Sequence, residues 1–166
     1  MRAIRLWSVR HSRGLMKLYD LFEGVIMAVE PATRRLGYSR LEAPVVAVEH
    51  GIKALMFDCQ MCGQCALSST GMSCPMNCPK NLRNGPCGGV RADGHCEVKP
   101  DMPCVWVKAW EGSLAIANEK FLDVQQPVDH RMKGSSSWLR LIRQKKDGDY
   151  PQPRSSARDA AARKAA

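Results

Sequence analysis

The chain has no long apolar run, few aromatic residues and no nucleotide-binding motif. No uninterrupted apolar stretch approaches the ~18–20 residues that a membrane-spanning helix needs, which predicts no transmembrane segment and no membrane partner. Neither a phosphate-binding loop nor a dinucleotide fingerprint is present. With 166 residues the chain is also shorter than a complete β/α barrel, which takes ~250, so any barrel chemistry must belong to a partner.

A secretory signal is also missing. The first 14 residues hold four arginines, no acidic residue and no apolar core: Arg2, Arg5, Arg10 and Arg13. Such a start resembles a mitochondrial transit peptide as well as an ordinary basic arm, and we favour the arm. Since nothing directs the chain to an oxidising compartment, its cysteines are expected to be intracellular metal ligands and the protein to be cytoplasmic.

Acidic residues are fewer than basic ones, and the formal net charge is +9. Residues 1–58 contribute +3, residues 59–104 contribute +1 and residues 105–166 contribute +5. A metal module that binds nucleic acid usually carries its basic residues beside the metal, whereas here the cysteines lie in the least basic segment. The distribution argues against a nucleic-acid partner.

Apolar periodicity predicts helices on either side of the cysteines. Residues 15–30 carry apolar side chains at helical intervals, which predicts an amphipathic helix that Pro31 ends. The side chains of this stripe are Leu15, Leu18, Phe22, Val25, Ile26 and Val29. Pro44 closes the connector that follows, and residues 45–57 form a second helix that Gly51 interrupts or weakens.

Two tryptophans at a four-residue interval, Trp106 and Trp110, predict a third helix over residues 105–121 that covers the cysteine block. Both tryptophans are expected to pack in the core as its lid and not to contact a ligand. A short basic amphipathic stretch follows at residues 139–146. The expected segments are a basic arm (1–14), a helical segment (15–57), a Cys-rich metal-binding block (58–104), a covering helix with a C-terminal segment (105–147) and a flexible tail (148–166). The expected fold class is a small α plus irregular metal-ordered domain, with a few helices around a Cys-rich iron–sulfur or zinc block.

All eight cysteines lie within 46 residues. They are Cys59, Cys62, Cys65, Cys74, Cys78, Cys87, Cys96 and Cys104. The same segment holds six glycines, five prolines and few large apolar side chains, so it cannot build a hydrophobic core. Short segments of this kind are usually folded by their metal, because the free energy of metal binding becomes free energy of folding.

The first three cysteines, Cys59, Cys62 and Cys65, follow the spacing C-x2-C-x2-C. One loop with this spacing can present three thiolates to a cubane cluster while a fourth cysteine arrives from elsewhere. Proline directly after Cys74 and Cys78 also recurs in ferredoxin motifs and supports iron–sulfur over zinc. Eight thiolates match two 4Fe–4S clusters, but they also match one 4Fe–4S cluster plus one zinc site, or two zinc sites.

Groups around the cysteines fit a second shell better than a catalytic site. Cationic side chains at Lys80, Arg83 and Arg91, and the amides of the Gly85–Gly89 turn, are expected to offset the negative charge of a thiolate-bound centre. His95 precedes Cys96 and is a minor alternative zinc ligand. Thiolates clustered this densely are better explained as ligands than as nucleophiles.

Five short motifs together carry a resemblance. They are Asp58-Cys59-Gln60-Met61-Cys62-Gly63-Gln64-Cys65, Cys74-Pro75-Met76-Asn77-Cys78-Pro79-Lys80, Asn84-Gly85-Pro86-Cys87-Gly88-Gly89, Gly94-His95-Cys96-Glu97-Val98 and Cys104-Val105-Trp106. This pattern resembles the Cys-rich C-terminal domain family associated with methylenetetrahydrofolate reductase, over roughly residues 45–140. The segment from Ser135 to Trp138 also looks like the closing motif of that family.

The resemblance implies an accessory subunit. In that family the domain is fused to a flavin-dependent reductase barrel or encoded beside it, and the small stand-alone form is ascribed an iron–sulfur electron-transfer role. The chain would relay electrons from a donor protein to the flavin of a separate methylenetetrahydrofolate reductase subunit, would hold no flavin and would not be catalytic alone. The alternative is a zinc-stabilised structural or docking module for a folate or methyl-transfer enzyme.

Overall fold

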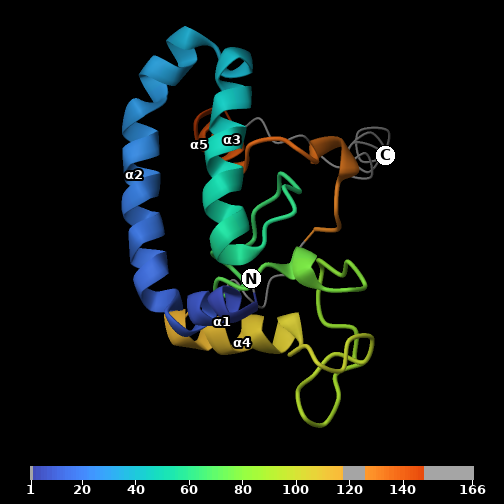
Figure 1. The fold of residues 1–166 in the computed structure, drawn as a ribbon. Helices are drawn as coiled ribbons and strands as arrows, with labels where there is room; N and C mark the ends of the chain where they lie inside the picture. Colours follow the sequence, from blue (N-terminus) through green and yellow to red (C-terminus); the bar gives the residue numbers. More distant parts are fainter. Residues whose placement is uncertain (1, 118–125, 148–166) are drawn as a thin grey trace, which may run out of the picture.

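The computed structural model describes residues 2–117 and 126–147, and these are mostly helical (Figure 1). The helices are α1 (Arg2–Arg10), α2 (Ser12–Leu36), α3 (Tyr38–Phe57), α4 (Val105–Ile116) and α5 (Ser137–Asp147), with short 3-10 turns at η1 (Pro75–Asn77) and η3 (His130–Met132). No β-strand occurs in the two described ranges, which contain isolated bridges at Val90–Cys96 and His95–Pro103. The helical part of the expected fold class is confirmed, while the metal-ordered block stays a prediction.

Two long helices, α2 and α3, form an antiparallel hairpin that dominates the molecule (Figure 1). Helices α1 and α4 lie across the base of the hairpin, and α5 packs against both of its helices. The loops between α3 and α4 extend from the base on the side away from α2 (Figure 1). The hairpin therefore presents the cysteine block at one end.

The hairpin is longer than the sequence predicts, because neither proline ends a helix. Helix α2 continues past Pro31, and α3 begins before Pro44 and runs without a break through Gly51. Pro31 is exposed, so water can hydrate the carbonyl that its missing N–H leaves unpaired. The chain turns instead at Gly37, whose φ of 86° suits a residue without a side chain. The predicted ends at Pro31 and Pro44 were wrong for this reason.

The apolar stripe predicted on the first helix divides between two faces of α2. Leu15, Phe22 and Ile26 are half-buried, and the Phe22 ring packs edge-on against Trp138 of α5 with 4.6 Å between ring centres. Leu18 and Val25, in contrast, are 60% and 54% exposed. Despite this apolar surface, no helix in the described part of the chain is long and apolar enough to cross a membrane.

The start of the chain, expected as a basic arm, is helical over α1 and packs on the body. Ser8 is buried and donates a hydrogen bond to the Met56 carbonyl oxygen at 3.1 Å. Arg2 pairs with Asp101, its guanidinium lying 2.7 Å from the carboxylate. Side chains of α1 therefore join the end of α3 to the loop that precedes α4.

The helix expected after the cysteine block is α4, which ends at Ile116. Residues 118–125 lie outside the described part, as does the expected tail at 148–166. Trp106 is 6% exposed and packs in the core as predicted, but Trp110 is 46% exposed, so its expected place in the core was wrong. The basic amphipathic stretch near the end of the described chain is α5.

Helix α4 meets the loop that precedes η1 through two glycines in backbone contact. A Cβ atom on Gly112 would lie 2.1 Å from the Gly71 carbonyl oxygen, and a Cβ on Gly71 would lie 2.2 Å from the Gly112 carbonyl carbon. Gly71 also has a φ of +55°. Because backbone cannot move aside as a flexible side chain can, only glycine fits at this crossing.

Replacement of Gly112 by alanine is expected to lower the free energy of unfolding by ~1–3 kcal/mol or more, because the new methyl group overlaps the Gly71 carbonyl. Gly24→Ala is the matched control: Gly24 is an exposed helical glycine, and a methyl group there would meet nothing within 4 Å. This control should raise stability by ~0.5–1 kcal/mol through helix propensity. Denaturant unfolding of both variants measures the two effects, and equal effects of the two substitutions would contradict the close crossing.

Candidate metal centre

Four of the eight cysteines line one cavity beside the C-terminal end of α3. The chain leaves α3 at Asp58, which adopts a left-handed conformation, and the C-x2-C-x2-C loop follows directly. A further cysteine reaches the cavity from the residue before η1. The cavity measures about 420 Å³, part of it open to solvent. The structure thus brings together Cys59, Cys62, Cys65 and Cys74.

The C-terminal segment holds the cysteine loop in place. The Gly134 N–H donates to the Met61 carbonyl oxygen at 2.7 Å, and the Arg140 guanidinium of α5 donates to the Gly63 carbonyl oxygen at 2.7 Å. A Cβ on Gly63 would lie 2.3 Å from the Met132 carbonyl oxygen, and the φ of Gly63 is +72°. The loop therefore needs glycine at this position so that η3 can pack directly on it.

Burial disfavours the ionised form of the thiols in the absence of a bound cation. It raises the pKa of the Cys59 thiol, although the Met61 N–H at 3.4 Å from the sulfur and the nearby Lys53 oppose the shift. Burial also raises the pKa of Cys74, and the negative charge of Cys59 adds to this effect. A bound metal deprotonates its thiol ligands outright, so this environment is compatible with ligation and unfavourable for a free nucleophile.

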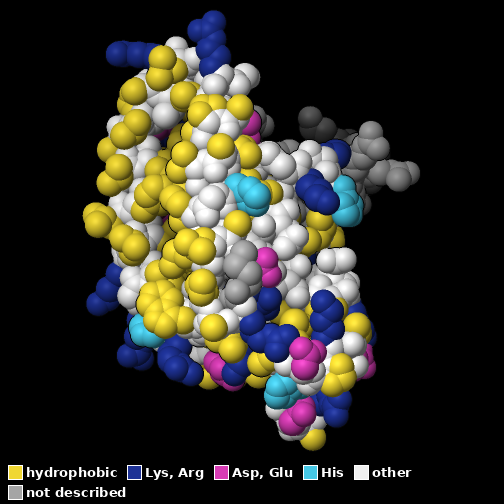
Figure 2. Space-filling model, viewed as in Figure 1, with side chains coloured by type: hydrophobic (Ala, Val, Ile, Leu, Met, Phe, Trp, Pro, Cys, Tyr) yellow, Lys and Arg dark blue, Asp and Glu magenta, His cyan; other side chains and the backbone are white. Residues whose placement is uncertain are grey.

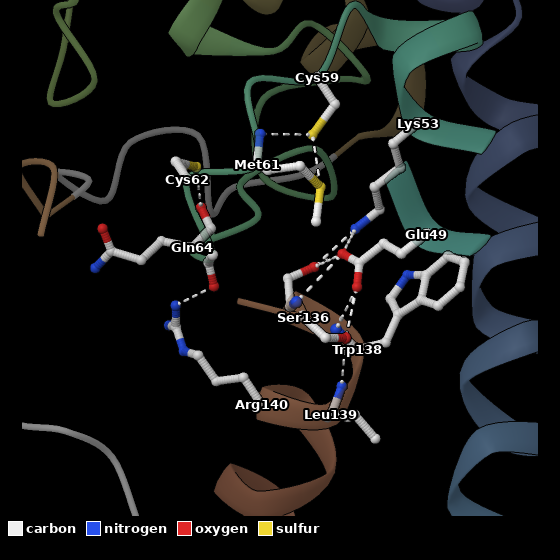
Figure 3. Close-up of polar contacts among 12 residues, drawn as sticks. Glu49, Lys53, Cys59, Met61, Cys62, Gln64, Ser136, Trp138, Leu139 and Arg140 are labelled. Carbon is white, nitrogen blue, oxygen red and sulfur yellow. Dashed lines mark hydrogen bonds and ion pairs between the residues drawn. The ribbon is translucent and has the colours of Figure 1, made fainter. Parts of the chain in front are cut away.

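Lys53 places a buried ammonium group beside the cavity (Figure 3). Its Nζ lies 2.7 Å from Glu49 Oε1, 2.7 Å from Ser137 Oγ and 5.2 Å from the centre of the Trp138 ring. Burial alone would lower the Lys53 pKa, but the negative charges of Cys65 and Glu49 outweigh it and the pKa is raised. Lys53 therefore stays positively charged next to the thiols.

Glu49 joins this lysine to the N-terminus of α5 (Figure 3). Its carboxylate accepts hydrogen bonds from the Ser136 and Ser137 hydroxyls at 2.6 and 2.5 Å, and from the backbone N–H groups of Ser137 and Trp138 at 3.2 and 3.3 Å. A carboxylate at this end of a helix satisfies N–H groups that lack helical partners and complements the helix dipole. The serine-rich turn is thereby tied to α3.

Glu49→Gln is expected to destabilise the protein by ~3–5 kcal/mol at neutral pH, because it leaves the buried Lys53 charge without its counter-charge. Burial alone would raise the Glu49 pKa, but Lys53 and the two serine hydroxyls lower it below its usual value. The contribution of Glu49 is therefore complete above the usual carboxyl pKa and is lost as pH falls through the lowered one.

The free energy of unfolding, measured from pH 7 to pH 3, should show the loss of the Glu49 contribution in the parent and not in the Glu49→Gln variant. Asp20→Asn, which removes an exposed carboxylate from α2, is the matched control and should change stability by less than about 0.5 kcal/mol. A Glu49→Gln variant as stable as the parent at neutral pH would contradict the importance of the buried pair.

The remaining four cysteines lie in the loops between η1 and α4. Cys78, Cys96 and Cys104 are buried and Cys87 is exposed. The Cys96 N–H donates to the Met102 carbonyl oxygen at 2.9 Å. The structure places these four residues in one loop region, outside the cavity that the first four line.

Two of the three cationic groups expected near the cysteines, Arg83 and Lys80, each lie near one of the two sets of four cysteines. Arg83 is 5% exposed, lines the four-cysteine cavity and donates to the Gln64 carbonyl oxygen. Lys80 pairs with Glu97, a contact that raises the Lys80 pKa, and the negative charges of Cys87 and Cys96 add to the shift. Arg91 instead lies 4.0 Å from Asp93.

His95 also faces Asp93, its Nδ1 lying 3.4 Å from the carboxylate. In residues 2–117 and 126–147, no three Cys, His, Asp or Glu side chains are close enough together to hold one metal ion. Each thiolate of a cubane binds a different iron, so its four sulfurs stand further apart than the ligands of a single ion. Metal binding by the eight cysteines therefore stays a prediction, and Lys53, Arg83 and the four-cysteine cavity are the structural features that bear on it.

A family model described as "Methylene-tetrahydrofolate reductase C terminal" matches residues 38–131, which is more than half of the chain. The chain belongs to this family. The match begins at the first residue of α3 and ends within η3, so it includes all eight cysteines and both Glu49 and Lys53. Comparisons with curated proteins and with solved structures found no match.

Membership in the reductase C-terminal family confirms the resemblance drawn from the cysteine motifs and links the chain to methylenetetrahydrofolate reductase. The sequence did not single out Glu49, Lys53 or Arg140, although each contacts the cysteine loop or its support. The available signal was the pair Glu49 and Lys53 at an i,i+4 interval in the helix that leads to the first cysteine. Such a pair usually lies on an exposed helix face, so the spacing alone does not indicate a buried ion pair.

Proposed function

We propose that the chain is an iron–sulfur electron-transfer subunit of a methylenetetrahydrofolate reductase complex. The observation that carries the proposal is the convergence of four thiols on one cavity in a member of the reductase C-terminal family. Three thiols come from the C-x2-C-x2-C loop and the fourth from Cys74, a set that consists of thiols alone. This donor chemistry suits iron–sulfur centres, whose ligands are cysteine thiolates.

The chain would hold two centres. The first is assigned to the cavity cysteines, and the second to the four remaining cysteines of the loops between η1 and α4: Cys78, Cys87, Cys96 and Cys104. Iron–sulfur centres supply one-electron transfer at potentials set by charge, hydrogen bonding and exposure. With two centres of this kind, the chain could store the two electrons that reduce one flavin.

Residues around the first cavity suit the stabilisation of a negatively charged group. Lys53 and Arg83 bring two buried cations to its wall, and the Met61 N–H points at the Cys59 sulfur at 3.4 Å. Cations and N–H donors beside the thiolates raise the reduction potential of a centre relative to an apolar site, because they favour the more negative reduced form. Around the second set, the Gly89 N–H lies 3.4 Å from the Cys87 sulfur.

The folate chemistry belongs to the partner in this proposal. No position in the chain matches a flavin or folate site, so the flavin-dependent barrel subunit would bind both and carry out the reduction. A further protein would donate electrons to this chain. The cysteine subunit would then connect that donor to the flavin, and it would not reduce folate alone.

Anaerobic mixing tests the proposed electron transfer. The chain, purified without oxygen and reduced with dithionite that is then removed, is mixed with the oxidised flavoprotein reductase from the same organism. We expect bleaching of the flavin absorbance together with reoxidation of the iron–sulfur spectrum, in a ratio of one flavin per two electrons stored. An iron-loaded chain that binds the flavoprotein and leaves its flavin oxidised would contradict the proposal.

A further inference from the structure

The outer face of the α2–α3 hairpin exposes large apolar side chains in two parallel rows (Figure 2). On α2 the row follows intervals of three and four residues, the spacing of one helix face. The two rows, with exposed fractions between 48% and 68%, are Leu18, Leu21, Val25 and Val29 on α2 and Val48, Ile52 and Leu55 on α3. At 1.5 Å per residue, the α2 row from Leu18 to Val29 is ~17 Å long. We call the surface that both rows form the hairpin face.

A groove runs between the two rows at the base of the hairpin. It forms an open cavity of about 920 Å³ whose walls are mostly apolar and include Leu18, Phe22, Ile52 and Trp138. Exposed apolar surface of this extent is characteristic of a protein interface, because isolated soluble proteins rarely leave large contiguous apolar patches in water. The groove has the shape and chemistry to receive an apolar helix or loop of another protein.

The charges at the ends of the hairpin argue against a second copy of this chain as the occupant. Basic residues lie at both ends of α2, with Arg10, Arg13 and Lys17 near its start and Arg34, Arg35 and Arg40 at the hairpin tip. Two copies of α2 packed in either direction would bring basic ends together, whether parallel or antiparallel. Like charges facing across an interface suppress association, so the better partner has acidic groups around an apolar surface.

The cysteine cavity opens toward this same groove. Cys65 is an exposed thiol and lines both cavities, as do Lys53, Phe57 and Leu67. The proposed first centre would therefore lie closest to a protein seated in the groove. Electron transfer requires short distances between centres, so the partner that exchanges electrons is the one expected to cover this face.

We propose that the hairpin face is the docking surface for the flavin-dependent reductase subunit, which would present an acid-rimmed apolar surface to it. This inference rests on the proposed function and adds to it where the partner binds and which centre it approaches. The family match begins at residue 38, so the α2 row lies outside the matched region.

The test uses the full chain, purified without oxygen, and the purified flavoprotein reductase from the same organism. Leu21→Asp combined with Val25→Asp puts two carboxylates on the exposed row without touching the cysteine cavity. Val98→Asp is the matched control, since Val98 is 50% exposed and lies in the loops away from the hairpin. We expect the double variant to lose about a hundredfold or more in affinity for the reductase and the control to bind as the parent does.

Iron content and circular dichroism of each variant show whether the fold and the centres survive. If the double variant keeps its iron and loses only the reductase, the docking proposal is supported. Undiminished reductase binding by the double variant would overturn it, as would a parent that forms a dimer through this face or binds phosphatidylglycerol vesicles in place of the reductase. A parent chain without iron would refute electron transfer. If reductase binding by that chain is still lost on the double substitution, the docking proposal is supported all the same.

Discussion

Replacing Cys62 by serine is expected to leave the protein with about half of its iron. Cys62 lines the cavity with Cys59, Cys65 and Cys74, whereas the other four cysteines lie outside this cavity, in the loops between η1 and α4. Loss of one thiolate should therefore empty one centre and spare the other, since each centre would have its own four ligands. Cys87→Ser should remove the complementary half. Iron and sulfide analysis of the variants after anoxic purification, beside the parent, measures both effects.

A methionine in the same cavity supplies the control. Met76 lines the four-cysteine cavity but has a thioether in place of a thiol, so Met76→Leu should keep the full iron content. Far-UV circular dichroism should show the α2–α3 hairpin intact in all three variants. Full iron in the Cys62 variant would remove the C-x2-C-x2-C loop from the ligand set, and with it the main argument for iron–sulfur over zinc.

Removal of the metal is expected to abolish amide-exchange protection through most of residues 59–104 while the hairpin keeps its own. The segment contains one 3-10 turn and isolated bridges, and most of its internal backbone hydrogen bonds are short-range turns, such as the one from the Thr70 N–H to the Ala66 carbonyl oxygen at 2.9 Å. Apart from its cysteines, the segment buries few large apolar side chains, namely Leu67, Met72 and Met102, so metal binding should supply most of its folding free energy.

Hydrogen exchange followed by mass spectrometry compares the chelated and the loaded chain peptide by peptide. Peptides from α2 and α3 serve as the internal reference, because their helical bonds do not depend on the cysteines. We expect protection factors in the cysteine block to fall by at least about a hundredfold and those of the hairpin to change little. Unchanged protection between Cys59 and Cys104 would show that the block folds without metal.

Periodicity located the helices better than it located their ends. The apolar intervals found both helices of the hairpin, yet Pro31 and Pro44 lie inside them and the turn occurs at Gly37. A proline costs a helix one hydrogen bond and some crowding, and a long helix packed along its length can tolerate that cost where the proline is exposed. A prediction from sequence includes the local cost of a proline in a helix but not the tertiary packing that offsets this cost.

The thiols could be found from sequence, but their grouping could not. Spacing identified the loop of three, whereas the fourth cavity cysteine, Cys74, depends on how η1 folds back toward α3. Glu49 and Lys53 were missed because their burial follows from contacts with α5, which lies more than 80 residues further along the chain. Polar side chains that meet only through tertiary packing leave no local pattern.

On the hairpin face, the sequence predicts burial where the structure leaves side chains exposed. The amphipathic pattern of α2 predicts one buried stripe, and the structure buries only part of it and leaves Leu18, Val25 and Val29 exposed. An apolar stripe at helical intervals predicts that one face of the helix is buried. It does not predict whether that face packs against the same chain or against a partner.

The metal content of the parent chain tests the central claim most directly. Protein purified without oxygen should be brown and should hold about eight irons and eight acid-labile sulfides per chain, four of each for the cavity cysteines and four for the loop cysteines. Plasma emission spectrometry with a colorimetric sulfide assay on the same sample gives both counts. A colourless protein with stoichiometric zinc and no sulfide would contradict the electron-transfer account and leave a zinc-stabilised docking module in its place.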